Sequence, residues 1–131
     1  AFYREKLYEK AGFSDLEDWI VRSWEGNFIR RSGDDLLSML KTWELSDISD
    51  NPIYNGDLTK ALGAITATSI IMPGRTDLYF TVHDSEVETK QMPNAEFRPI
   101  ESIWGHRAGN PSLNPEDATF LRQAVDDLLA G

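Results

Sequence analysis

The stretch Ser69-Ile70-Ile71-Met72-Pro73-Gly74-Arg75-Thr76-Asp77 joins a short apolar run to a turn that ends in a carboxylate. The run begins near Ile65 and shows little alternation of apolar and polar residues, which is typical of a strand buried on both faces of a parallel sheet. Pro73 and Gly74 end this predicted strand. Asp77 is therefore expected in a loop just beyond the strand's carboxyl end.

Working outward from this strand, the rest of the C-terminal half predicts a helix, a second strand and a final helix. Thr81 begins a predicted helix that reaches about Gln91, because Thr81 and Asp84 have the spacing of a capping box. Residues 96–100 form the second predicted strand, which Pro99 places near a sheet edge. The final helix begins at Asn114-Pro115, a cap followed by a first-turn proline.

The order strand, helix, strand, helix predicts an α/β fold with parallel strands. One right-handed crossover would make the two strands neighbours. Two strands leave most of their backbone edges uncovered, so we expect further strands to complete the sheet. An uncovered edge and apolar face also predict self-association, as a homo-oligomer.

Residues 1–56 predict helices and turns. Ser14 and Glu17 have capping-box spacing for one helix, and Asp34 is the predicted cap of another. We therefore divide the chain into a helical cap segment, residues 1–56, and an αβαβα part, residues 57–131, which carries the loops that follow the two strands.

The amino-acid composition argues against several classes of binding partner. The net charge of −9 argues against nucleic acid, whose phosphates require a basic face, and against anionic membranes. No apolar run approaches the roughly 18 residues that a membrane helix needs. The chain has no cysteine, which excludes disulfides, thiolate zinc sites and a cysteine nucleophile. The absence of cysteine is compatible with a reducing compartment, and we expect a cytoplasmic location. The chain begins with neither Met nor a signal-peptide pattern, so we expect a preceding portion.

The motif Ile103-Trp104-Gly105-His106 follows the second predicted strand, as Asp77 follows the first. Functional loops of open parallel sheets gather at the carboxyl ends of the strands, so both side chains are expected at one edge. A carboxylate bound to one imidazole nitrogen orients the ring, and the other nitrogen can then take a proton from a hydroxyl. Serine hydrolases built on a parallel sheet carry their catalytic triad in the chain order Ser, then Asp or Glu, then His. Asp77 and His106 are therefore candidate catalytic residues.

Each of these residues also has an ordinary explanation. An aspartate after Pro-Gly-Arg-Thr is commonly a turn residue, and a Gly-His pair is commonly a surface histidine. The 131 residues contain no Gly-x-Ser-x-Gly, the motif that carries the nucleophile. Ser32, Ser69 and Ser102 do not lie on a predicted strand-to-helix elbow, so none of them is a good substitute.

Other chemistry-bearing residues support no further site. The chain has two histidines, without the helical spacing that metal sites use, so we predict no metal and no cofactor. Trp19, Trp24 and Trp43 lie on helical apolar stripes, where tryptophans are usually core or interface residues. They could instead line an acyl pocket if the helical segment covers the site.

Residues 61–129 resemble the C-terminal part of α/β-hydrolase-fold enzymes, particularly the homoserine O-acetyltransferase-like group. The stretches 69–80, 92–96 and 102–106 and the closing helix carry this resemblance. It implies the C-terminal part of an α/β-hydrolase fold, with parallel-sheet strands and flanking helices preceded by a helical cap. It also implies that Asp77 is the triad acid and His106 the triad base.

One departure concerns the residue after the histidine. Acetyltransferases of this group usually continue with Asp-Ala-Phe-Leu, whereas His106 is followed by Arg107. An acidic residue there suits an ammonium group, which Arg107 would repel. Arg107 is therefore a candidate substrate-binding residue, and a carboxylate-bearing or neutral acyl substrate, or hydrolysis by water, fits better than homoserine.

The resulting hypothesis is the C-terminal portion of a serine-dependent hydrolase or O-acyltransferase that acts on a small-molecule acyl substrate through an acyl-enzyme. Its expected partner is the missing N-terminal portion of the same protein, which would supply the nucleophile and the oxyanion hole, so the chain alone would be inactive. The alternative is a non-catalytic binding or interaction module that keeps the hydrolase scaffold. The distance between Asp77 and His106 discriminates the two.

Overall fold

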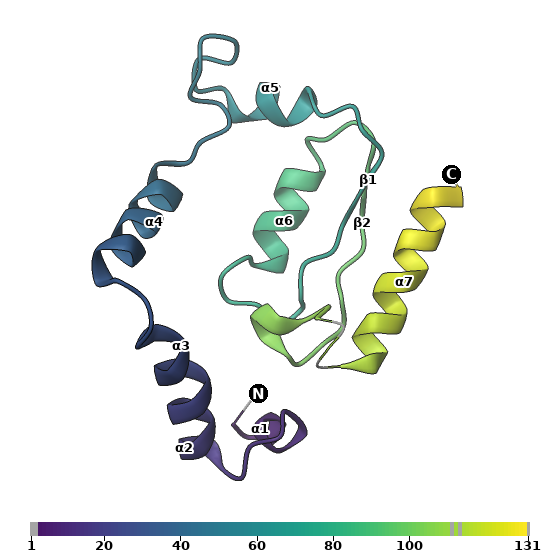
Figure 1. Cartoon of the computed structure of the whole chain (residues 1–131). Coiled ribbons are helices and arrows are strands. Elements are labelled where there is room, and N and C mark those ends of the chain that lie inside the picture. The colour runs from purple at the N-terminus through teal and green to yellow at the C-terminus, as the bar shows by residue number, and fades with distance from the viewer. Residues whose placement is uncertain (1–2, 111, 113, 131) are drawn as a thin grey trace.

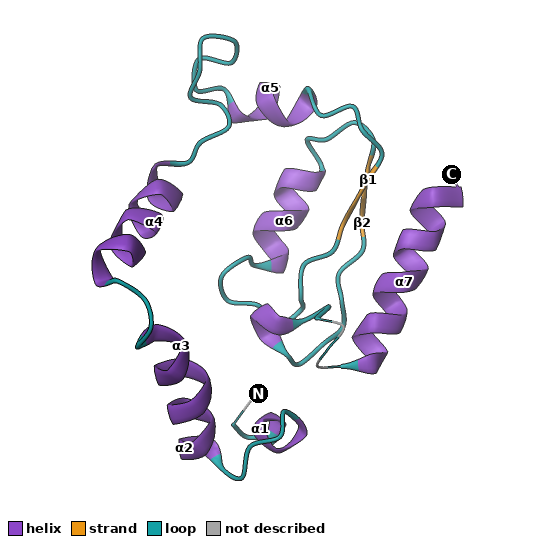
Figure 2. Cartoon of the chain, in the orientation of Figure 1, coloured by secondary structure: helices purple, strands orange, loops and turns teal. Residues whose placement is uncertain are grey.

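A parallel pair of strands with a helix on each side forms the C-terminal half of the computed structural model, which describes residues 3–110, 112 and 114–130 (Figures 1 and 2). β1 (Ser69–Ile71) pairs in parallel with β2 (Ala95–Phe97). Helix α6 (Val82–Thr89) joins the strands and lies on one side of them, and α7 (Pro115–Ala130) lies on the other (Figure 1). The predicted α/β class with parallel strands is confirmed.

The regular strands are shorter than the sequence predicts, although the pairing continues beyond them. Gly74 forms a further parallel bridge with Ile100. The Arg75 amide donates to the Ile100 carbonyl, and the Ile100 amide donates to the Pro73 carbonyl, both at 2.9 Å. Pro73 has no N–H to donate, so the ladder lacks a donor at that position. Pro99 does not interrupt it, because the amides of Arg98 and Ile100 on either side both donate to the first strand at 2.9 Å.

The N-terminal half is built from short helices. They are α1 (Leu7–Lys10), α2 (Leu16–Trp19), the π-helix η1 (Ile20–Glu25), α3 (Gly26–Phe28), α4 (Gly33–Leu45) and α5 (Leu58–Gly63). None of residues 3–56 lies in a strand. Among all described residues, no helix is long and apolar enough to cross a membrane.

Two helix caps differ from the sequence prediction by one or two residues. Asp15 caps α2 and accepts the Asp18 amide at 2.9 Å, because the Ser14 amide and hydroxyl donate to the Asp18 carboxylate instead. Ser32 caps α4, which places Asp34 in the first turn rather than at the cap. A carboxylate in the first turn is still favourable because the positive end of the helix dipole lies there.

The caps of the C-terminal half agree with the sequence prediction. Thr81 caps α6, accepting the Asp84 amide at 3.2 Å and donating to the Asp84 carboxylate at 2.6 Å. Asn114 Oδ1 accepts the Glu116 amide at 3.0 Å, and Pro115 is the first residue of α7. These local hydrogen bonds fix the residues at which α6 and α7 begin.

The buried apolar core is small. It consists of Leu7, Tyr8, Ala61, Leu62, Ile100, Trp104 and Ala124. Many large apolar side chains are exposed, among them Ile29 and Leu78. Exposed apolar surface of this extent is typical of surfaces that contact other protein.

Gly74 allows the loop after β1 to lie directly against the turn after β2. A Cβ atom at Gly74 would lie 2.7 Å from Ala108 Cβ and 2.9 Å from the Gly105 carbonyl oxygen. Separations under 3.0 Å lie inside van der Waals contact, so no other residue fits without moving one of the two segments.

Thr76 joins the same two segments through its hydroxyl. Its Oγ1 donates to the Ser102 carbonyl oxygen at 3.0 Å and accepts the Gly105 amide at 3.0 Å. One side chain of the first loop thus binds the backbone of the second at two points.

We expect Gly74→Ala to lower the free energy of unfolding by about 1–3 kcal/mol, because the added methyl group overpacks the junction. Gly33→Ala is the matched control, since no atom lies within 4 Å of its added Cβ. That variant should be neutral or more stable by about 0.5 kcal/mol. Urea unfolding measures both, and equal stability of the two variants would contradict the close approach.

We expect Thr76→Val to accelerate hydrogen exchange at the Gly105 amide, because it removes the acceptor while keeping the side-chain shape. Thr76→Ser keeps the hydroxyl and should retain the parent's protection. Thr76 is exposed, so water can replace its hydrogen bonds and overall stability should change by under about 1 kcal/mol. NMR-detected exchange is the measurement; unchanged protection in Thr76→Val would show that the hydroxyl does not hold the two segments together.

Candidate active site

Two loops at the carboxyl ends of the parallel strands carry the candidate residues. Asp77 lies in the loop that follows β1, and His106 lies in η2 (Gly105–Arg107), the 3-10 turn that follows β2. Gly105 has a φ of 57°, a left-handed conformation that favours glycine, and it immediately precedes the histidine. The structure thus places both side chains at the edge of the sheet where the sequence predicts them.

Asp77 and His106 form a direct hydrogen bond. The distance between His106 Nδ1 and Asp77 Oδ2 is 3.0 Å. The other carboxylate oxygen, Oδ1, accepts the Tyr79 amide at 2.8 Å. The Asp77 side chain is 7% exposed, whereas that of His106 is 54% exposed. A buried acid therefore holds one side of a ring whose other side is open.

Asp77 is ionised at neutral pH. Burial alone would raise the pKa of its carboxyl, but the Tyr79 amide and the His106 ring donate hydrogen bonds that outweigh burial and hold this pKa below its usual value. An ionised carboxylate can only accept hydrogen bonds, so the shared proton belongs to His106 Nδ1. Nε2 remains as the ring nitrogen that can exchange a proton with another molecule.

Two aromatic rings flank the imidazole. The Tyr79 ring lies edge-on to it with centroids 4.9 Å apart, and the Phe80 ring is tilted at 5.5 Å. The two residues lie two and three positions after Asp77 in the chain, so one short loop supplies the acid and the rings. The sequence predicts no role for Tyr79 or Phe80, although two adjacent aromatic residues soon after a candidate acid are a signal of such a role.

A hollow of about 530 Å³ opens beside His106. Its lining side chains are Trp24, Trp43, Tyr79, Phe80, His106 and Arg107. Trp43 of α4 contacts Phe80 with ring centroids 6.2 Å apart. Two of the three tryptophans singled out in the sequence therefore border the candidate site; Trp19 does not line the hollow and contacts Trp24 edge-on at 6.0 Å.

Arg107 connects the histidine turn to the helical segment. Its guanidinium donates to Ser23 Oγ at 3.5 Å and lies 5.9 Å from the centroid of the Trp19 ring. Within the described part of the chain it forms no ion pair with a carboxylate. Arg107 thus borders the hollow without a salt bridge to any described carboxylate.

The three candidate serines of the sequence, Ser32, Ser69 and Ser102, form hydrogen bonds with groups other than the imidazole. Ser32 caps α4, and the Ser69 hydroxyl donates to the Ala67 carbonyl at 3.1 Å. Ser102 is buried, and its Oγ accepts the Trp104 amide at 3.2 Å. None of these hydroxyls bonds to His106.

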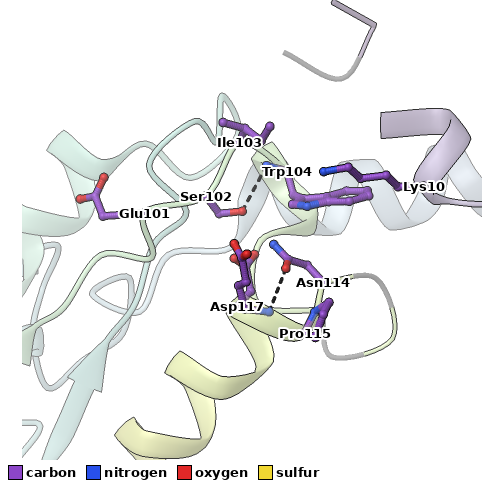
Figure 3. A pocket seen from close by; sticks show the side chains of 9 residues that line it. Lys10, Glu101, Ser102, Ile103, Trp104, Asn114, Pro115 and Asp117 are labelled. Atoms are coloured by element: carbon purple, nitrogen blue, oxygen red, sulfur yellow. Dashed lines mark hydrogen bonds between the residues drawn. The ribbon is translucent and has the colours of Figure 1, made fainter. Parts of the chain in front are cut away.

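A larger hollow of about 670 Å³ lies near the start of α7, and neither Asp77 nor His106 lines it (Figure 3). Figure 3 shows that two of its polar side chains are bound to nearby backbone amides, Ser102 to Trp104 and Asn114 to Glu116. Its buried carboxylate, Asp117, accepts the Gly109 amide at 3.1 Å. These groups serve the local backbone, so the candidate site is the smaller hollow beside His106.

The other histidine of the chain, His83, is not part of a cluster of metal ligands among the described residues. His83 is exposed on α6. Across residues 3–110, 112 and 114–130, no three His, Asp or Glu side chains gather closely enough to hold a metal ion.

Two curated proteins have sequences similar to this chain. An ethyl acetate hydrolase of Pseudomonas veronii is 37% identical over 105 residues, which are 80% of this chain and 30% of the hydrolase. A protein of Corynebacterium glutamicum named as a probable esterase is 30% identical over 105 residues, with the same shares. The chain thus spans about a third of the length of the curated relatives it matches. No family model matches the sequence.

Two solved structures are similar to the fold over 99% of the chain. The acetyl esterase MekB has a TM-score of 0.88 and 33% sequence identity, with 37% of its own chain covered. An acetylester hydrolase from Corynebacterium glutamicum has a TM-score of 0.89 and 25% identity, with 36% covered. All four relatives are named as esterases or ester hydrolases and none as an acyltransferase, so the finer resemblance to homoserine O-acetyltransferases is not confirmed. The chain has the α/β fold of part of a hydrolase.

Proposed function

We propose that this chain contributes the acid and the base of a serine-dependent carboxylic ester hydrolase. The observation that carries this proposal is the 3.0 Å contact between His106 Nδ1 and the buried, ionised Asp77. It leaves Nε2 oriented and free to transfer a proton beside an open hollow, as a general base requires.

In the proposed reaction, His106 Nε2 takes the proton of a serine hydroxyl as the serine oxygen bonds to the ester carbonyl carbon. The carbon–oxygen bond to the alcohol then breaks, and the imidazolium returns the proton to the departing oxygen. Water repeats the sequence on the acyl-enzyme and releases the carboxylic acid. Asp77 stabilises the imidazolium and keeps its orientation throughout.

The relatives support water as the acyl acceptor and an acetyl ester as the substrate. Ethyl acetate hydrolase, acetyl esterase and acetylester hydrolase are the names of three of them. An uncharged ester also fits the site, because Arg107 borders the hollow and would repel an ammonium group. Arg107 is in this proposal a residue that selects against cationic substrates.

The nucleophile and the oxyanion hole would come from a further portion of the same protein. Three observations support this: the relatives are about three times as long, no described serine forms a hydrogen bond with the His106 side chain, and many large apolar side chains are exposed. The isolated chain should then lack activity, and its exposed surface should favour a homo-oligomer. Residues 1–56 would act as a cap, since Trp24 and Trp43 form one wall of the hollow.

We expect His106→Ala and Asp77→Asn, in the full-length protein that contains this chain, to lower kcat for ethyl acetate hydrolysis by about 10⁴-fold. KM should change little, because proton transfer is lost rather than ground-state binding. His83→Ala is the matched control, as the other histidine is exposed on α6, and it should keep the parent's kcat. Initial rates from a pH-stat give these values.

The isolated chain should hydrolyse the ester no faster than buffer does. If His106→Ala in the full-length protein retained kcat within tenfold of the parent, His106 would not be the base. The non-catalytic binding module, with its hydrolase scaffold, would then be the better account of the chain.

A further inference from the structure

The hollow beside His106 has a wall of aromatic rings that the acid–base chemistry does not use. Trp24, Trp43, Tyr79 and Phe80 are 44–62% exposed, although rings of this size gain free energy from burial. They come from three separate elements and line one hollow together with His106. Tyr79 and Phe80 contact the imidazole, and Trp43 contacts Phe80. Exposed rings gathered beside the proposed base indicate a ligand that covers them.

The chemistry of ester cleavage determines which portion of the substrate, acyl or alcohol, would occupy this hollow. The base that activates the nucleophile must also return its proton to the departing alcohol oxygen, at a distance of about 2.6–3.2 Å. That oxygen therefore lies next to His106 Nε2 when the bond to the carbonyl carbon breaks. The carbon attached to it must lie against whatever flanks the imidazole, which here is the rings of Tyr79 and Phe80.

We propose that the hollow lined by Trp24, Trp43, Tyr79 and Phe80 is the binding site for the alcohol portion of the ester, and that it prefers an uncharged aryl or bulky alkyl group. This inference rests on the proposed ester hydrolysis and adds the substrate class on the alcohol side. The acyl portion, on the other side of the broken bond, lies toward the nucleophile and outside this hollow.

Size and charge support an uncharged aromatic group. About 530 Å³ lies within the usual range of small-molecule sites, about 300–1,000 Å³, and accepts a single ring. Ring edges and faces offer offset or edge-to-face packing to such a group. Arg107 would repel a cationic alcohol; its guanidinium donates to Ser23 and lies 5.9 Å from the centroid of the Trp19 ring.

Binding of an alcohol needs no nucleophile, so the first experiment uses this chain alone. Benzyl alcohol should shift the ring resonances of His106 and Phe80 in NMR titrations, and Phe80→Ala should weaken its binding about 10-fold. Phe120→Ala is the matched control, because Phe120 is a partly exposed phenylalanine on α7 that lines no described hollow, and it should leave binding unchanged. 4-(Aminomethyl)benzyl alcohol, which adds a cation, should bind more weakly than benzyl alcohol.

The second experiment uses the full-length protein and separates the two sides of the ester. Phe80→Ala should lower kcat/KM for benzyl acetate about 10-fold relative to ethyl acetate. It should leave the preference between ethyl acetate and ethyl butyrate unchanged, because those esters differ only in the acyl group. Phe120→Ala should change neither ratio.

A shift of the acyl preference with an unchanged alcohol preference would overturn the proposal and assign the hollow to the acyl group. Equal binding of benzyl alcohol by the parent chain and Phe80→Ala would overturn it as well. Failure of the proposed ester hydrolysis can be distinguished from failure of this inference, because binding of benzyl alcohol by the isolated chain does not depend on turnover.

Discussion

The parallel pairing of β1 and β2 is the constraint on which the candidate site depends. It brings the loop after β1 and the turn after β2 to one edge, although Asp77 and His106 are 29 residues apart in the chain. Backbone hydrogen bonds continue this pairing through Pro73 and Ile100, and Gly74 lets the two segments touch. Thr76 then binds the backbone of the second segment. The acid–base distance is thus set by the sheet and by the contacts of Gly74 and Thr76.

Competing electrostatic effects determine the protonation state of the Asp77–His106 pair. Burial penalises a charged carboxylate and by itself would favour the neutral form of Asp77. Two donors, the Tyr79 amide and His106 Nδ1, act in the opposite direction, one on each oxygen. Because the donors prevail, the proton stays on the imidazole. A buried carboxylate that remains ionised can accept the imidazole N–H and so orient the base. A neutral carboxyl group would instead carry a proton of its own at this position.

Local rules account for most of what the sequence predicts correctly. The strand breaks at Pro73, the caps at Thr81 and Asn114, and the positions of Asp77 and His106 follow from neighbouring residues and from chain order. The caps of α2 and α4 differ from the prediction because a neighbouring side chain accepts the first-turn amide. Asp15 accepts the Asp18 amide while Ser14 donates to the Asp18 carboxylate, and Ser32 accepts the Asp35 amide. Contacts between distant segments, such as Thr76 with Gly105 or Trp43 with Phe80, have no local signal.

The aromatic side chains around His106 fall into two groups with different freedom to vary. Tyr79 and Phe80 share a loop with Asp77, and the Tyr79 amide binds the carboxylate, so a change that moves these rings also moves the acid. Trp24 and Trp43 lie on helices that, among the described residues, make no hydrogen bond to Asp77 or His106. Changes in the helical segment can therefore reshape the outer wall of the hollow while the proton-transfer pair stays in place. In the proposed reaction, substitutions in the helical segment would therefore change the hollow alone, whereas substitutions of Tyr79 or Phe80 would also affect Asp77.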